Sequence, residues 1–241
     1  MNIQPSTNLL YEGKAKKLFA TNDPEILWVE YKNSLTAFNG QLKDSLTGKG
    51  ALTNQISCFL FDQMNKNDIP THFVEQTGEL THIAKKVEII PLEVVIRNLT
   101  TGSLCKRLGI KEKIRLPRPL LELYYKDDDL GDPFVSDEHA LLFGWSNEND
   151  LSEVKRMALK INTILGELFD SIGIILVDFK LEFGKTSDGK LVLADEISPD
   201  TCRFWDKDTM EKLDKDRFRQ DLGDVLGAYQ EIFNRLQDAI K

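Results

Sequence analysis

Residues 177–184 read VDFKLEFG, and this short stretch is the most informative part of the sequence. The side chains of a β-strand point alternately to its two faces. The four apolar residues of the stretch therefore share one face, which we expect to pack into the core. The opposite face carries Asp178, Lys180 and Glu182. Because charges are costly to remove from water, this face predicts ion pairs or a bound ligand that bridges the three side chains.

A second strand is predicted at residues 190–197, after a Ser-Asp-Gly turn at 187–189. If the two strands pair across that turn, Asp195 lies diagonally beside Glu182. Two carboxylates at one place suit Mg²⁺, which prefers oxygen ligands and is usually shared with phosphates. The alternative is an exposed hairpin whose charged face holds only ion pairs, and the residue types leave both interpretations open.

The rest of the chain predicts strands and helices in an order without regular βα alternation. The strand patterns occur at residues 9–12, 14–20, 26–31, 71–90 and 93–97. Apolar residues at helical spacing predict helices over 52–64 and 225–236. Asp150 with Glu153 resembles the capping box of a third helix, whereas residues 39–50 and 111–150 are predicted to form a loop and irregular structure. This order favours an α+β fold over a Rossmann fold.

The composition is that of an acidic globular protein. The 241 residues carry 39 Asp and Glu against 31 Lys and Arg, which gives a net charge of −8. An acidic surface disfavours nonspecific nucleic-acid binding, so we expect no nucleic-acid partner. The three cysteines match no metal-binding spacing, and no stretch resembles a signal peptide or a membrane span. We therefore expect a cytoplasmic protein without a membrane partner.

The segment RNLTTGS, residues 97–103, has the composition of an anion site. Arg97 can bind a phosphate with its planar guanidinium, and Gly102 permits a close approach of the backbone. Ser103 can cap a short helix over 104–108 and donate its hydroxyl to the anion. The simpler alternative is an ordinary helix cap next to a surface arginine.

Two further segments place basic groups near a turn. In EGKAKK, residues 12–17, Lys14 and Lys16 are expected on the same face of a strand, where two ammonium groups suit a polyphosphate. The alternative is an edge strand on which lysines prevent aggregation. In SPDTCRFWD, residues 198–206, Arg203 offers a second guanidinium for an anion.

Taken together and in order, these stretches resemble the SAICAR synthetases (phosphoribosylaminoimidazole-succinocarboxamide synthetases) over nearly the whole chain. The similar segments are YEGKAKKLF, PLEVVIRNLTTGSLCKRLGI, LVDFKLEFG and DEISPDTCRFWDK followed by DKDRFRQ. The resemblance implies a two-lobed α+β fold of antiparallel sheets with flanking helices, related to ATP-grasp and kinase-like architectures. We expect a nucleotide-binding lobe over residues 1–90 and a lobe with the ribotide and metal sites over residues 91–241.

The resemblance also implies a reaction and its participants. An ATP-dependent carbon–nitrogen ligase would join L-aspartate to the carboxylate of carboxyaminoimidazole ribotide (CAIR), giving SAICAR, ADP and phosphate in de novo purine biosynthesis. Mg²⁺ is the implied cofactor and a homodimer the implied assembly. ATP phosphorylates the carboxylate, which supplies a good leaving group, and the aspartate amine then attacks the mixed anhydride.

The resemblance implies roles for individual residues in each substrate site. ATP would be bound by Lys14, Lys16, Ile89 and Lys126. The ribotide would be bound by Arg97, Ser103, Asp200 and Arg203. Mg²⁺ would be ligated by Glu182 and Asp195, and the catalytic residues would be Lys180 and Asp200. The loop that closes over aspartate would contribute Lys43, Asp44, Lys49, Gly50 and Asn54.

Two positions depart from the family pattern. Asn39 stands where several relatives carry an acid, and Thr201-Cys202 replaces a smaller Gly-Ser pair. Both concern substrate positioning rather than the class of reaction.

Two other functions compete with the ligase. A kinase-like phosphotransferase would use the same ATP and metal groups but would release ADP without aspartate, and the sequence lacks the HRD motif of kinases. A non-catalytic nucleotide-binding module would bind ATP without turnover.

Overall fold

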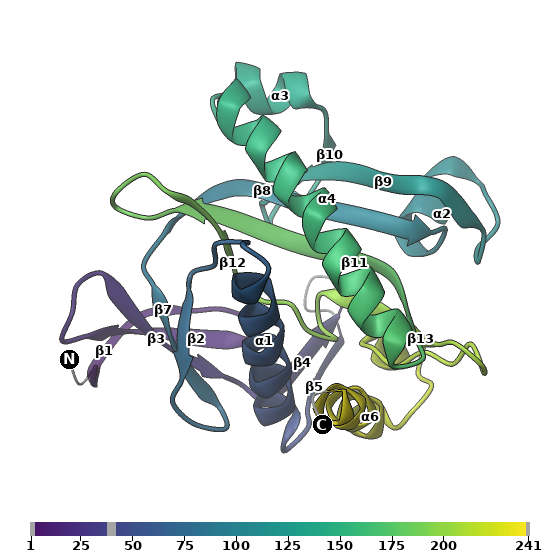
Figure 1. Cartoon of the computed structure of the whole chain (residues 1–241), viewed down its shortest axis with the longest axis horizontal. Coiled ribbons are helices and arrows are strands. Elements are labelled where there is room, and N and C mark those ends of the chain that lie inside the picture. The colour runs from purple at the N-terminus through teal and green to yellow at the C-terminus, as the bar shows by residue number, and fades with distance from the viewer. Residues whose placement is uncertain (1–2, 38–41, 240–241) are drawn as a thin grey trace.

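The computed structural model describes residues 3–37 and 42–239, and its helices and antiparallel sheets confirm the α+β class (Figure 1). The first sheet has five strands in the order β1-β2-β3-β7-β6. Its strands are β1 (Pro5–Glu12), β2 (Lys16–Thr21), β3 (Ile26–Tyr31), β6 (Phe73–Gln76) and β7 (Thr81–Lys85). A separate hairpin is formed by β4 (Ser34–Ala37) and β5 (Leu42–Ser45).

The second sheet follows the order β10-β9-β8-β11-β12, and β13 also pairs with β11. Its strands are β8 (Glu88–Leu99), β9 (Arg115–Tyr125), β10 (Phe134–Val135), β11 (Ile174–Lys185), β12 (Leu191–Ala194) and β13 (Cys202–Asp206). Because β8 occupies one edge of β11, β12 and β13 must share the other edge. Residues 195–201 therefore leave the sheet beside the middle of β11.

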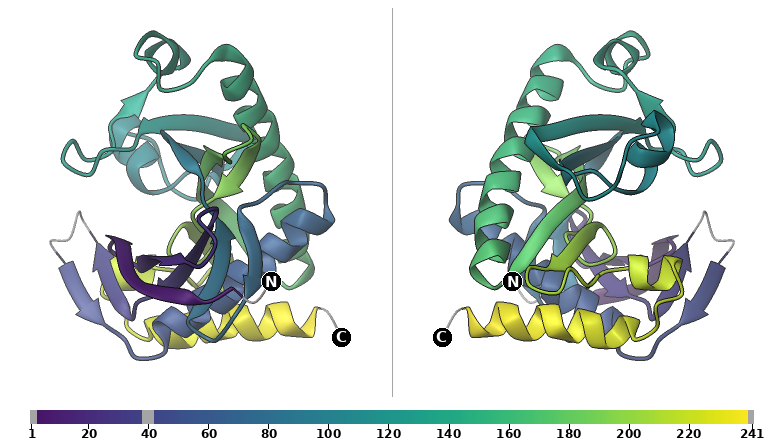
Figure 2. Two further views of the ribbon diagram at one scale, coloured as in Figure 1. Left: turned by 90° about the vertical axis from the view of Figure 1, so that its left-hand side faces the viewer. Right: turned by 90° about the vertical axis from the view of Figure 1, so that its right-hand side faces the viewer.

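Helices cover the sheets and join the two halves of the chain. The helices are α1 (Lys49–Lys66), α2 (Gly102–Leu108), α3 (Asp137–Leu142), α4 (Glu148–Ser171), α5 (Asp216–Arg219) and α6 (Val225–Asp238). The long helix α4 packs on β11 and β8, and α6 packs against α1. Figure 2 shows the second sheet with α4 on one side of the molecule and the first sheet with α1 and α6 on the other.

One hydrophobic core spans both halves of the chain. It includes Ile56 and Phe61 from α1, Leu165 from α4, and Leu181 from β11, each fully buried. The chain passes from the first sheet to the second between β7 and β8, so the predicted boundary at residue 90 falls inside β8. The division into two lobes stays a proposal. No helix among residues 3–37 and 42–239 has both the length and the apolar character needed to cross a membrane.

The prediction that residues 111–150 are irregular is wrong, because β9 spans eleven of them. Pro117 and Pro119 lie in β9 where the register with β8 shifts, between the pairs Arg97↔Leu120 and Leu99↔Arg115. A bulge is one of the few places where a strand accepts proline, which has no N–H to donate. The prolines therefore mark an irregularity within a strand rather than its absence.

Two smaller predictions also need correction. Residues 39–50 are not all loop, since β5 and the start of α1 fall within them, and Asn39 lies outside the described residues. The strand β5 is exposed throughout and lacks the apolar alternation that would have shown it. Helix α4 starts one turn before the predicted capping box, because the side chain of Asn147 accepts a hydrogen bond from the backbone N–H of Asp150 (3.0 Å).

Candidate active site

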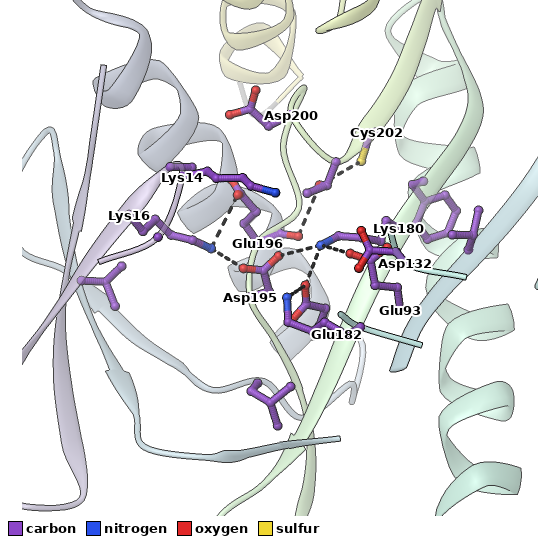
Figure 3. A pocket seen from close by; sticks show the side chains of 18 of the residues that line it. Lys14, Lys16, Glu93, Asp132, Lys180, Glu182, Asp195, Glu196, Asp200 and Cys202 are labelled. Atoms are coloured by element: carbon purple, nitrogen blue, oxygen red, sulfur yellow. Dashed lines mark hydrogen bonds and ion pairs between the residues drawn. The ribbon is translucent and has the colours of Figure 1, made fainter. Parts of the chain in front are cut away.

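A cavity of about 760 Å³ is lined by residues from both sheets, and most of the predicted site residues lie on its wall (Figure 3). The predicted residues that line it are Lys14, Lys16, Ile89, Arg97, Lys126, Lys180, Glu182, Asp195, Asp200 and Arg203. One face of β11 contributes the three charged residues that the sequence pattern places together. The loop at residues 195–201, which leaves the sheet beside the middle of β11, also contributes to the lining, with Asp195, Glu196, Asp200 and Thr201.

Lys180 joins three carboxylates at the centre of the cavity. Its Nζ lies 3.1 Å from Glu93 Oε1, 2.6 Å from Glu182 Oε1 and 3.4 Å from Asp195 Oδ2. Strand register explains this arrangement, because Glu182 is paired with Glu93 on β8 and with Ala194 on β12. Burial disfavours the charge of Lys180, but the three carboxylates outweigh burial and hold its pKa well above the ordinary value. These contacts favour the ammonium form of Lys180, which cannot act as a base.

Lys16 approaches the same carboxylates from the first sheet. Its Nζ lies 2.5 Å from Asp195 Oδ1 and 3.5 Å from Glu196 Oε1. Burial would raise the pKa of Asp195, but Lys16 and Lys180 together hold it well below its usual range. Asp195 has a φ of +60°, a left-handed conformation that aspartate tolerates better than most residues. This conformation ends β12 and begins the loop that carries the acidic residues.

Two further lysines lie at the rim of the cavity. Lys14 is in the turn before β2 rather than on a strand face, so the prediction that it shares a face with Lys16 is wrong. Its Nζ pairs with Asp128 Oδ1 at 2.7 Å, on the loop after β9. The Nζ of Lys126 lies 3.0 Å from Glu182 Oε1, which therefore accepts from both Lys126 and Lys180.

At the other end of the cavity, Asp178 lies between the two arginines expected to bind the ribotide. It is paired with Arg97 on β8 and with Arg203 on β13. Asp178 Oδ2 accepts from Arg97 NH1 at 2.8 Å and from Arg203 NH1 at 2.9 Å. Ser103 is not the cap of α2, because Thr101 holds that position, but its Oγ accepts from Arg97 NH2 at 2.9 Å. Arg97 is thus engaged in buried ion pairs and still borders the cavity.

Asp200 is surrounded by donors. Lys49 pairs with its Oδ2, and the Tyr229 hydroxyl donates to its Oδ1 at 2.9 Å. Lys215 lies 3.5 Å from the same Oδ1. Burial opposes ionisation, but Lys49 and Lys215 hold the pKa of Asp200 well below its ordinary value. Because its ionised form is so strongly favoured, Asp200 accepts a proton poorly and is a weak base.

The structure brings one of the five predicted aspartate-loop residues, Lys49, to the end of the cavity that holds Asp200. Lys49, at the start of α1, contacts Asp200, while Lys43 and Asp44 lie exposed on β5. Asn54 is buried and donates to the carbonyls of residues 78, 79 and 81, which fixes the turn before β7. A side chain at Gly50 would come within 3.0 Å of the Lys32 carbonyl, so this glycine permits close packing of α1.

Sequence reasoning missed several residues that complete the site. These are Glu93, Glu122, Glu196, Lys215, Asp216 and Tyr229. Glu93 could have been found, because it alternates with Val95 and Arg97 and so shares the face of β8 that carries Arg97. The others depend on contacts between distant segments, for which the sequence carries no spacing signal.

The metal-binding capacity of the cavity rests on two carboxylates. Within the described residues, no group of three or more His, Cys, Asp or Glu side chains is arranged to hold a metal ion. Glu182 and Asp195 nevertheless present hard oxygen donors on either side of Lys180. Mg²⁺ often takes only one or two carboxylates and completes its shell with water and phosphate oxygens, so this donor pair fits Mg²⁺.

Comparison with known proteins assigns this arrangement to a family. The family model described as SAICAR synthetase matches residues 9–236. The chain belongs to the SAICAR synthetase family. A phosphoribosylaminoimidazole-succinocarboxamide synthase from Desulfitobacterium hafniense is 56% identical over 233 residues, covering 97% of this chain and 98% of the relative.

Solved members of the SAICAR synthetase family share the fold. The crystal structure of the synthase from Ehrlichia chaffeensis has a TM-score of 0.94 and 46% identity, covering 95% of this chain and 98% of that one. A SAICAR synthetase in complex with ADP has a TM-score of 0.91 and 48% identity, covering 94% of this chain and 96% of that one. The fold implied by the resemblance is therefore confirmed.

Proposed function

We propose that this chain is an ATP-dependent carbon–nitrogen ligase of purine biosynthesis, which joins L-aspartate to the carboxylate of CAIR and gives SAICAR, ADP and phosphate. Membership of the SAICAR synthetase family supports this reaction, as does the relative that is described with bound ADP. The observation that carries the proposal is the face of β11. There, Lys180 and Glu182 meet the nucleotide-side lysines, and Asp178 meets a separate pair of arginines.

The nucleotide end of the cavity is suited to phosphoryl transfer. The ammonium groups of Lys16 and Lys180 are fixed by carboxylates and face the same space, so they can stabilise charge on the transferring phosphoryl group without reorganisation. Lys14 and Lys126 would bind the outer phosphates from the rim, and Ile89 would contact the adenine. Glu182 and Asp195 would hold Mg²⁺, which supplies charge neutralisation for the phosphates when bound.

The other end of the cavity would bind the ribotide and aspartate. Arg97, Ser103 and Arg203 would hold the ribotide phosphate. Lys49 and Lys215 are cations beside Asp200, where a carboxylate of aspartate would be attracted. Since Asp200 has a lowered pKa, we infer that a substrate phosphate accepts the proton of the aspartate amine, while Asp200 orients the surrounding cations. Placing three substrates in one cavity also removes much of the entropic barrier to reaction.

The test is a coupled assay of ADP release in which CAIR, aspartate and ATP are omitted one at a time. The ligase requires all three substrates for turnover. ADP release without aspartate would instead identify a phosphotransferase. ATP binding without any turnover would identify a nucleotide-binding module.

We also propose an assembly and a location for the enzyme. The family resemblance supports a homodimer, and the acidic composition disfavours a nucleic-acid partner. The three scattered, free cysteines support a cytoplasmic enzyme, and the sequence has no apolar run long enough to predict a membrane partner. Sedimentation equilibrium at micromolar concentration would separate the dimer from a monomer.

A further inference from the structure

Seven side chains form one continuous series of ion pairs along the ribotide end of the cavity. Positive and negative groups alternate through it without interruption. In order, this arginine–carboxylate series is Arg107, Glu122, Arg97, Asp178, Arg203, Asp216 and Arg219. It begins on α2, crosses the strands of the second sheet and ends on α5. Four arginines and three carboxylates leave one net positive charge.

The two inner arginines are held in the same way. Each gives its NH1 group to the shared Asp178. Each gives its Nε to an outer carboxylate, at 2.6 Å from Arg97 to Glu122 and at 2.8 Å from Arg203 to Asp216. The guanidinium group is planar, so hydrogen bonds at both Nε and NH1 hold it in one orientation. That orientation sets the direction in which the third nitrogen, NH2, points.

Both NH2 groups point toward the start of α2. Arg97 NH2 donates to Ser103 Oγ at 2.9 Å and to the Tyr124 hydroxyl at 3.2 Å, and the Ser103 hydroxyl keeps its own hydrogen to donate to a ligand. Arg203 NH2 lies only 2.8 Å from where a Cβ at Gly102 would be, and Gly102 also has a φ of +57°. Only glycine leaves room for Arg203 here, so both NH2 groups lie beside the first residues of α2.

The outer carboxylates do not touch the cavity themselves. Glu122 is 5% exposed and Asp216 is 2% exposed, and neither is among the residues that line the cavity. We propose that Glu122 and Asp216 are positioning residues that aim Arg97 and Arg203 at the phosphate of the ribotide. This inference rests on the proposed function, since it assumes that the ribotide occupies this end of the cavity.

Removing either carboxylate has two opposite consequences. The site becomes more positive by one charge, which would strengthen attraction to a dianionic phosphate and lower the KM for CAIR. Each carboxylate also serves a second arginine, and an amide keeps only one acceptor oxygen. The contact that fixes Nε is therefore weakened or given up to the outer arginine, which would misdirect NH2 and raise that KM. The direction of the change therefore separates positioning from simple charge balance.

The experiment measures kcat and the KM values for CAIR and ATP in the full-length enzyme carrying Glu122→Gln or Asp216→Asn. We expect the KM for CAIR to rise about tenfold, equivalent to the loss of roughly one charge-assisted hydrogen bond. The KM for ATP and kcat should stay within about twofold, because the nucleotide end is unchanged. Inorganic phosphate, used as a competitive inhibitor against CAIR, should weaken in parallel.

The matched control is Asp206→Asn. Asp206 is a buried carboxylate paired with Arg235 Nη2 at 2.7 Å, outside the cavity, so its variant should leave all three constants unchanged. If the first two variants do not fold, Tyr124→Phe removes the hydroxyl that bridges Arg97 and Glu122, and should raise the KM for CAIR about threefold.

An unchanged or lowered KM for CAIR, or an equal rise in the KM for ATP, would overturn the positioning role. The wild-type enzyme assayed in parallel keeps the two conclusions separate. If the wild type turns over all three substrates, only the roles of Glu122 and Asp216 are in question. If it does not, the proposed function fails first.

Discussion

Replacing Glu182 by glutamine tests the proposed metal and phosphoryl site while preserving its shape. The Oε1 atom accepts from Lys180 at 2.6 Å and from Lys126 at 3.0 Å, and glutamine can still accept both hydrogen bonds. A hydrogen bond between charged groups contributes about 1 kcal/mol more than one with a neutral acceptor, so roughly 2 kcal/mol of stability is at stake. Lys126 is partly exposed, and relief of repulsion with Glu93 offsets part of the loss. In a chain of this size, a loss of about 2 kcal/mol corresponds to a fall in Tm of about 4–8 °C, and the true fall should be no larger.

The effect on activity should be much larger than the effect on stability. Loss of one group that stabilises charge in the transition state typically lowers kcat by about 10²–10³-fold. We therefore expect Glu182→Gln to fold normally at 25 °C and to lose kcat by that factor in the ADP-release assay at saturating substrates. Asp195→Asn should behave alike, because its carboxylate faces Lys16 and Lys180 from the opposite side.

The control is Glu153→Gln, since Glu153 is an exposed carboxylate paired only with Arg156 on the same helix. It should keep both Tm and kcat. If Glu182→Gln and Asp195→Asn retained kcat within about threefold of the wild type, the assignment of these carboxylates to metal and phosphoryl chemistry would be refuted.

Three other changes have defined outcomes. Arg97→Ala should raise the KM for CAIR far more than the KM for ATP, and equal increases would contradict a phosphate role. Burial raises the pKa of Asp214 to about 7, above its value in the unfolded chain. The contribution of protonated Asp214 to the free energy of unfolding is therefore fully present at low pH and is lost as the pH rises toward 7. Asp214→Asn should flatten this decline in urea unfolding between pH 4 and 7, and an unchanged slope would show that another group causes it. Lys49→Met leaves Asp200 buried with one partner fewer and should lower the free energy of unfolding by about 3 kcal/mol. The double variant with Asp200→Asn should recover much of that loss, and a single-variant loss below about 1 kcal/mol would argue against a strong pair.

The spacing of apolar residues predicted the helices and strands that bury one face. The helices α1 and α6 and the strands β3, β11 and β12 lie close to where apolar spacing placed them. Two strands were missed for different reasons, because β5 is exposed along its length and β9 contains two prolines. The start of α4 was misplaced because Asn147 and Asp150 are both acceptable caps, and only the folded helix selects between them.

The site was predictable to the extent that one strand carries it. The alternating charges of β11 were visible in the sequence, and the pairing with β12 followed from the turn between them. The partners of these charges come from β8, β13 and the segments that follow β9 and β12, and which residue meets which depends on strand register. Glu122 illustrates the limit, since it is 25 residues from Arg97 in sequence and matches no motif, yet it holds the guanidinium of Arg97.

The face of β11 also sets the distance between the two ends of the cavity. A strand advances about 3.3 Å per residue, so Asp178 and Glu182 are separated by roughly 13 Å of rigid backbone. That length is fixed by hydrogen bonding to neighbours on both edges and does not vary with side-chain choice. Deleting a single residue between these positions would turn the side chains at one end of the cavity into the core. Only a deletion or insertion of two residues would keep both ends on the same face.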